Sequence, residues 1–87
     1  MRADAVVDAV LRRWVEQYGL TGAESALLRA AVEGSDRAEY ARVRMVSYAT
    51  VKKQAQTIID KTGDESLDRA ANRLLRQALD VACEKPP

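Results

Sequence analysis

Residues 20–63 read LTGAESALLRAAVEGSDRAEYARVRMVSYATVKKQAQTIIDKTG, and residues typical of helix ends recur along this segment. Thr21 and Glu24 have the spacing of a capping box, in which a hydroxyl and a carboxylate each satisfy a backbone donor at a helix start. Gly34 and Gly63 suit helix ends. The pattern predicts helices over residues 22–33, 36–43 and 47–62, with a tight turn at residues 44–46. Ser35 or Asp36 caps the short middle helix, and Ser47 caps the third.

The helix predicted over residues 47–62 has two chemically different faces. Helical geometry places the apolar side chains Val51, Ala55 and Ile58 on one side. It places Lys52, Lys53 and Gln56 on the opposite side. We therefore expect the apolar side to pack into a core and the basic, hydrogen-bonding side to face outward.

Two further helical patterns flank this segment. Residues 3–18 are amphipathic, and Trp14 is expected to anchor them to the rest of the fold; stacking on a ligand is the alternative. Residues 66–82 carry a broad apolar band. Residues 84–87 should fray because their prolines cannot extend a helix. The sequence predicts an all-α bundle of about five helices, divided into an N-terminal helix for packing or dimerisation (1–19), a main domain (20–83) and the tail (84–87).

Composition excludes several classes of function. The chain has 87 residues, a net charge of +1, no His and a single Cys, Cys83. Without His, the commonest general base and metal ligand is missing, and no phosphate-binding loop or Cys cluster is present. No segment is apolar for long enough to span a membrane. We therefore expect a cytoplasmic binding protein rather than an enzyme, with no metal and no cofactor. The small net charge means that any argument for nucleic-acid binding must rest on where the charges lie.

The chain resembles the LuxR-type (GerE-type) helix-turn-helix domain over residues 20–80. The resemblance is carried, in the right order and spacing, by Leu20-Thr21-x-Ala23-Glu24, Gly34, Ala38-Glu39-x-Ala41, Val46-Ser47-x-x-Thr50-Val51-Lys52, Ile58 and Lys61-Thr62-Gly63. It implies a four-helix DNA-binding domain whose third helix, here 47–62, lies in the major groove. It also implies that the last helix commonly forms a dimer.

The resemblance assigns roles to individual side chains of the groove helix. Lys52 corresponds to a lysine that reaches base edges, and Lys53 and Gln56 occupy the neighbouring outward positions. Thr50 and Lys61 would lie near phosphates. A lysine can donate to guanine and a glutamine can pair with adenine through two hydrogen bonds. The alternative is that these polar side chains only keep the helix solvated.

Further phosphate contacts are expected from the preceding helix, because that helix crosses the DNA backbone in helix-turn-helix proteins. Arg42 and Arg44 are the main candidates. Their alternative role is solvation, or pairing with Asp36 and Glu39. Tyr48 either donates its hydroxyl to a phosphate or lies flat on the turn.

The broad apolar band of the last helix raises the question of a partner. We expect a homodimer interface there, because unburied leucines forfeit apolar burial. The alternative is that helix 3–18 covers the band within one chain. The predicted interface residues are Leu67, Ala71, Leu74, Leu75 and Ala78.

Together these observations predict a small sequence-specific regulator of transcription that binds double-stranded DNA as a dimer. Another regulator or RNA polymerase would be a further partner. The competing hypothesis is a protein-interaction module, an antiactivator or assembly domain that keeps the fold without binding DNA.

Overall fold

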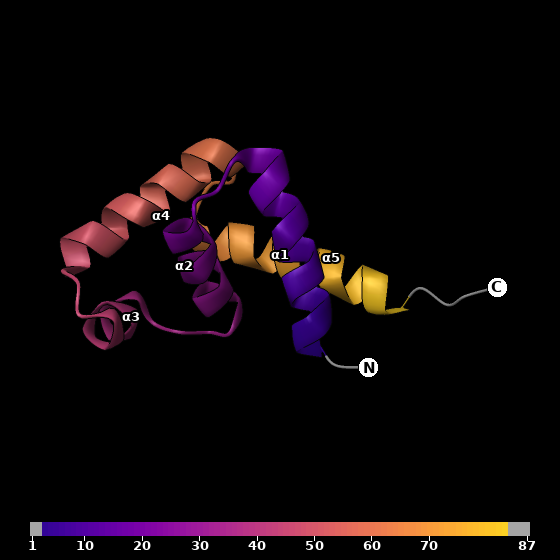
Figure 1. The fold of residues 1–87 in the computed structure, drawn as a ribbon, viewed down its shortest axis with the longest axis horizontal. Coiled ribbons are helices and arrows are strands. Elements are labelled where there is room, and N and C mark those ends of the chain that lie inside the picture. Colours follow the sequence, from indigo (N-terminus) through magenta and orange to yellow (C-terminus); the bar gives the residue numbers. More distant parts are fainter. Residues whose placement is uncertain (1–2, 84–87) are drawn as a thin grey trace.

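The computed structural model describes the backbone of residues 3–83 and the side chains of residues 5–82. Within this part of the chain, five α-helices follow one another and no strand occurs (Figure 1). The predicted all-α class is confirmed, while the predicted fraying of residues 84–87 lies outside the described residues. The helices are α1 (Ala3–Tyr18), α2 (Gly22–Val32), α3 (Arg37–Arg44), α4 (Tyr48–Thr62) and α5 (Leu67–Cys83).

The helix boundaries follow from side chains that satisfy backbone groups. At the start of α2, the Thr21 hydroxyl accepts from the Glu24 N–H at 3.1 Å, and the Glu24 carboxylate accepts from the Thr21 N–H at 2.9 Å. The predicted capping box is confirmed. Ser47 caps α4, since its hydroxyl accepts from the Thr50 N–H at 3.1 Å. Helix α4 ends at Gly63, whose φ of 80° is a conformation that glycine adopts without steric cost.

A turn of three residues joins α3 to α4. Asp36 rather than Ser35 caps α3, because its carboxylate accepts from the Ala38 N–H at 3.2 Å. Met45 ends α3 in the left-handed conformation, with φ 58°. This conformation is uncommon for a residue other than glycine. The chain then turns sharply into Ser47, so α3 and α4 have the order helix, tight turn, helix.

Helix α5 lies at the centre of the fold, with α1, α2 and α4 packed against it (Figure 1). The most fully buried large side chains come from every helix except α3, whose only buried core residue is the small Ala41 and whose Tyr40 packs partly buried against the core. Helix α3 and the start of α4 form one end of the molecule (Figure 1). The start of α1 and the end of α5 lie at the other end. The largest fully buried side chains are Trp14, Leu27, Leu28, Ile58, Leu74, Val10 and Val51.

Trp14 fixes α1 onto α5. Trp14 is 1% exposed, and its indole N–H donates to the Gln77 side-chain oxygen at 2.8 Å. The Arg73 guanidinium lies 4.2 Å from the centre of the Trp14 ring and makes two hydrogen bonds to Asp64, of 3.0 and 2.9 Å. Tyr18 packs edge-on against the same ring. The anchoring role predicted for Trp14 is confirmed, and no ring face is left open for a ligand.

The apolar band of α5 lies inside the monomer, which corrects the predicted dimer interface. Leu67, Ala71, Leu74 and Ala78 are at most 4% exposed, and Leu75 is partly buried against the same core. Helix α1 packs along α5 and covers part of this band, while α2 and α4 cover the rest. The prediction that these residues form a dimer interface is wrong for the four buried ones. The alternative, coverage by helix 3–18 within one chain, holds for the part of the band that α1 covers.

Candidate nucleic-acid interface

The outward face of α4 carries the three side chains predicted to contact bases. Val51 and Ile58 are fully buried and Ala55 is 8% exposed, so this side of the helix is fixed against the core. The opposite side is thereby held toward solvent, and Lys52, Lys53 and Gln56 are all exposed. We call these three residues the α4 face. The separation of the two sides agrees with the prediction from helical periodicity.

Lys52 and Gln56 of the α4 face line one pocket together with Arg37, Tyr48 and Glu65, so a carboxylate as well as a guanidinium lies beside this face. Helix α1 lies over α5, not over the start of α4 (Figure 1). The Lys52 ammonium lies 6.0 Å from the centre of the Tyr48 ring. The Gln56 amide donates to Asp60, one turn further along, at 2.9 Å. Gln56 must release this bond to offer both its donor and its acceptor to a base.

The candidate phosphate-contacting residues on α3 and in the first turn of α4 are also exposed. Arg42, Arg44, Tyr48 and Thr50 all lie at the solvent surface. The Arg44 guanidinium lies 5.2 Å from the centre of the Tyr40 ring, one turn earlier on α3. The Thr50 hydroxyl shares a hydrogen bond of 2.8 Å with the Ser47 hydroxyl. Tyr48 and Thr50 lie in the first turn of α4, and Tyr48 lines one pocket with Lys52 and Gln56 of the α4 face.

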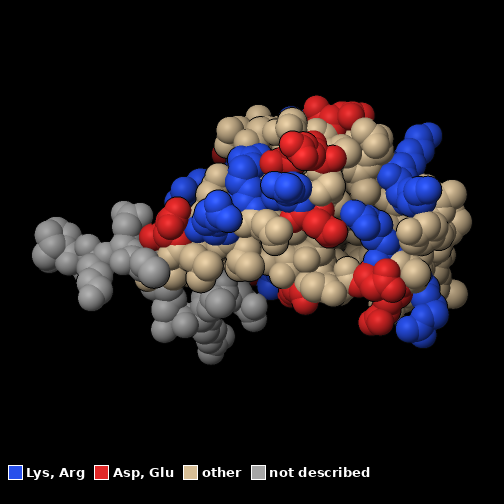
Figure 2. Space-filling view, turned by 180° about the vertical axis from the view of Figure 1, so that it is seen from behind, with Lys and Arg blue, Asp and Glu red and all other residues tan. Residues whose placement is uncertain are grey.

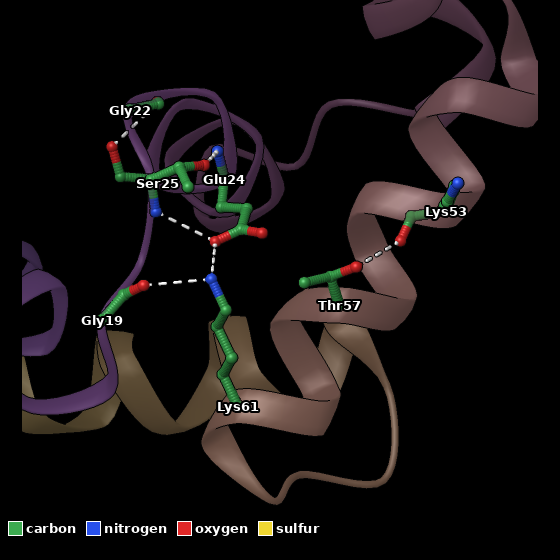
Figure 3. A network of polar contacts seen from close by, with 8 residues as sticks. Gly19, Gly22, Glu24, Ser25, Lys53, Thr57 and Lys61 are labelled. Atoms are coloured by element: carbon green, nitrogen blue, oxygen red, sulfur yellow. Dashed lines mark hydrogen bonds and ion pairs between the residues drawn. The ribbon is translucent and has the colours of Figure 1, made fainter.

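Lys61, unlike the other candidate phosphate-contacting residues, is paired with a buried carboxylate (Figure 3). Its ammonium lies 2.7 Å from the Glu24 carboxylate and 3.0 Å from the carbonyl oxygen of Gly19. Burial tends to raise the pKa of Glu24, but the hydrogen bonds from Lys61 and Thr21 outweigh it and lower that pKa. Lys61 therefore connects the end of α4 to the start of α2. A contact with phosphate would require it to leave a buried carboxylate.

Charge is distributed unevenly along the chain, although the total is only +1. Residues 40–59 contain four basic side chains and no acidic one, whereas the other residues contain ten basic and thirteen acidic ones. This segment covers most of α3, the turn and most of α4. In Figure 2 that end, on the right, shows blue side chains with tan surface between them and red only at its lower edge. The acid-free run could have been recognised in the sequence by counting acidic residues locally.

Sequence reasoning did not identify an exposed apolar segment at the same end. Val43 is 70% exposed, Met45 90%, Val46 41% and Tyr48 49%. Among the described residues, the only other large apolar side chain this exposed is Leu79, on α5. We call Val43, Met45, Val46 and Tyr48 the turn surface. Apolar residues are expected inside a protein, so no local pattern indicated that these would face solvent.

Neither a metal site nor a membrane-spanning helix occurs in the part of the chain that the structure describes. Residues 5–82 contain no cluster of three metal-binding side chains. None of the five described helices has both the length and the apolar character needed to cross a membrane.

Comparisons with known proteins leave the family of this chain open. No protein-family model, curated protein or solved structure matches it.

Proposed function

We propose that this chain is a small regulator of transcription that binds double-stranded DNA through the α4 face. The observation that carries the proposal is the combination of Lys52, Lys53 and Gln56 on an exposed helix with an acid-free basic segment around it. The resemblance to LuxR-type domains supports the same assignment. The proposal describes a cytoplasmic binding protein that needs no cofactor and catalyses no reaction.

The dimensions of α4 suit the major groove. A helix with its side chains is about 10–12 Å across, and the groove of B-DNA is about 12 Å wide. Helix α4 has 15 residues and starts at the end of the molecule, so its first turns can enter the groove without α1 in the way. Lys52 and Lys53 would donate to guanine N7 and O6. Gln56 would pair with adenine once it releases Asp60.

The basic side chains around α4 would supply most of the affinity. Arg42, Arg44 and the two lysines of the α4 face can each neutralise a phosphate if they do not reach a base. Neutralised phosphates release counterions, so four such contacts give a slope of about −3.6 in a plot of log K against log salt. Two copies bound to one duplex would have to meet through a surface other than the buried residues of α5.

The competing proposal is a protein-interaction module that keeps this fold without binding DNA. The turn surface favours it, because exposed apolar side chains gathered in one place mark sites of protein contact. Asp60, which holds Gln56, also places a negative charge beside the α4 face.

A mobility-shift titration separates the two proposals. The protein is titrated into a labelled duplex of random sequence at low salt, and the binding is repeated at increasing salt. The DNA-binding proposal expects retardation at micromolar protein and a steep loss of affinity with salt. No retardation at micromolar protein, or binding that is insensitive to salt, would contradict it and favour the interaction module.

A further inference from the structure

A pocket of about 240 Å³ lies between α4, the start of α5 and the first residue of α3. We call it the α4–α5 pocket. Its apolar lining comes from Ala55 and Ile59 of α4 and from Leu67, the first residue of α5. The pocket therefore offers both apolar contact and polar groups. The polar side chains that line it include Arg37, Tyr48, Lys52, Gln56 and Glu65.

Side chains of opposite charge line this pocket without pairing. Arg37 is partly buried, whereas Lys52 and Glu65 are exposed. None of the three makes an ion pair or a side-chain hydrogen bond with another residue of the described chain. The Lys52 ammonium lies over the ring of Tyr48, which also lines the pocket. Two cations and one carboxylate therefore remain available to a bound molecule.

Arg37 is placed where the fold gains little from a positive charge. It is the first residue of α3, and the start of a helix carries partial positive charge that disfavours a cation. Its guanidinium has five N–H donors, which lose water where the side chain is buried. Asp36 and Asp68 line an adjoining pocket with Arg37, but neither pairs with it. Asp36 caps α3 and Asp68 lies in the first turn of α5, where a helix start favours a carboxylate.

The charges of the pocket indicate which class of ligand fits. A carboxylate would accept hydrogen bonds from Arg37 and Lys52, and a guanidinium matches the two oxygens of a carboxylate. A simple anion would leave Glu65 unpaired and would add a second negative charge beside it. A ligand that also carries an ammonium would pair with Glu65, so that all three charged side chains gain a partner.

The size and the apolar lining of the pocket complete the description of the ligand. A cavity of about 150 Å³ holds benzene, so by proportion this pocket holds about ten non-hydrogen atoms. An apolar side chain on the ligand would pack on Ile59 and Leu67, which gives affinity without further polar groups.

We propose that the α4–α5 pocket binds a free apolar α-amino acid of about the size of leucine. Its carboxylate pairs with Arg37 and Lys52, its ammonium pairs with Glu65, and its side chain packs on the apolar lining. The pocket shares Lys52 and Gln56 with the α4 face, but binding of the amino acid does not require DNA. The test of this site therefore stands whatever the outcome of the DNA titration.

The test compares three small molecules that share one branched apolar chain. Leucine carries both charges, 4-methylpentanoate lacks the ammonium, and isoamylamine lacks the carboxylate. Each is titrated at neutral pH into the whole protein labelled with ¹⁵N, and the backbone amide signals are followed by NMR. Leucine should bind with a Kd of about 1 mM or tighter and should shift the signals of residues that line the pocket. Each of the other two molecules should bind at least about fivefold more weakly, because each loses one charged contact.

Two substitutions separate the contacts of the two charged groups. Glu65→Gln should weaken leucine binding at least about fivefold and should not weaken binding of 4-methylpentanoate, which has no ammonium. Arg37→Gln should weaken binding of both molecules by a similar factor, since both carry the carboxylate. Arg69→Gln, which removes an exposed arginine of α5 that does not line the pocket, is the matched control and should leave binding unchanged. Circular dichroism checks that the variants remain folded.

The proposal fails if leucine gives no saturable shift up to about 10 mM. It also fails if the three molecules bind equally, because the pocket would then recognise only the apolar chain. Wild-type affinity for leucine in either Glu65→Gln or Arg37→Gln would likewise exclude the proposed contacts.

Discussion

The Lys61 ammonium lies 2.7 Å from the Glu24 carboxylate and joins the end of α4 to the start of α2. The Glu24 side chain is 8% exposed, and it also accepts the hydrogen bond that completes the cap of α2. The pair therefore fixes the helix that carries the α4 face to the rest of the bundle.

Replacing Lys61 by Met should lower the free energy of unfolding by about 1–3 kcal/mol, because a buried carboxylate loses its charged partner. Urea denaturation measures the change. Lys53→Met is the matched control on the same helix, and it should stay within about 0.5 kcal/mol because Lys53 is exposed. Equal, small effects of the two substitutions would show that the pair contributes nothing to stability.

Stability should fall in acid because two carboxylates are held in their charged form. The pKa of Glu24 is below its ordinary value of 4.5, and hydrogen bonds from Arg73 lower the pKa of Asp64 below 3.8 against the opposing effect of burial. In the unfolded chain both groups bind protons more readily. Their stabilisation is therefore fully present above the ordinary values and is lost as the pH falls through the lowered folded values.

Unfolding in urea at about pH 7 and about pH 3 measures this loss. The Lys61→Met variant should lose less free energy of unfolding between these two conditions than the wild type, because the pKa of its Glu24 is no longer held down by an ammonium. An identical loss in the two proteins would exclude Glu24 as a source of the acid sensitivity.

Leu74 tests whether the apolar band of α5 is core or interface. It is fully buried within one chain, so Leu74→Ala should cost about 2–5 kcal/mol of stability. The unfolding midpoint should not depend on protein concentration. Leu79→Ala, at an exposed position of the same helix, should cost much less. If the unfolding midpoint rose with protein concentration in the wild type but not in Leu74→Ala, the apolar band of α5 would be a dimer interface after all.

The local features of this fold could be predicted from the sequence. The caps at Thr21, Ser47 and Gly63 involve residues within one turn of each other, and the faces of α4 follow from helical periodicity. The partner of each apolar face could not be predicted in this way. The band of α5 is covered by α1, α2 and α4, and Lys61 meets Glu24 from 37 residues away. The exposure of Met45 also depends on tertiary context, since none of the five described helices covers this side chain.

The most direct test of the α4 face compares two double variants that remove the same charge from different helices. Lys52→Ala/Lys53→Ala removes two exposed cations from α4, and Arg69→Ala/Arg76→Ala removes two from α5. Fluorescence anisotropy then measures binding of a random duplex to each variant at low salt. We predict that the α4 variant binds at least about tenfold more weakly than the wild type, with a salt slope smaller by about 1.8, and that the α5 variant changes little. Equal losses in the two variants would mean that only net charge attracts DNA, and the assignment of α4 to the major groove would be wrong.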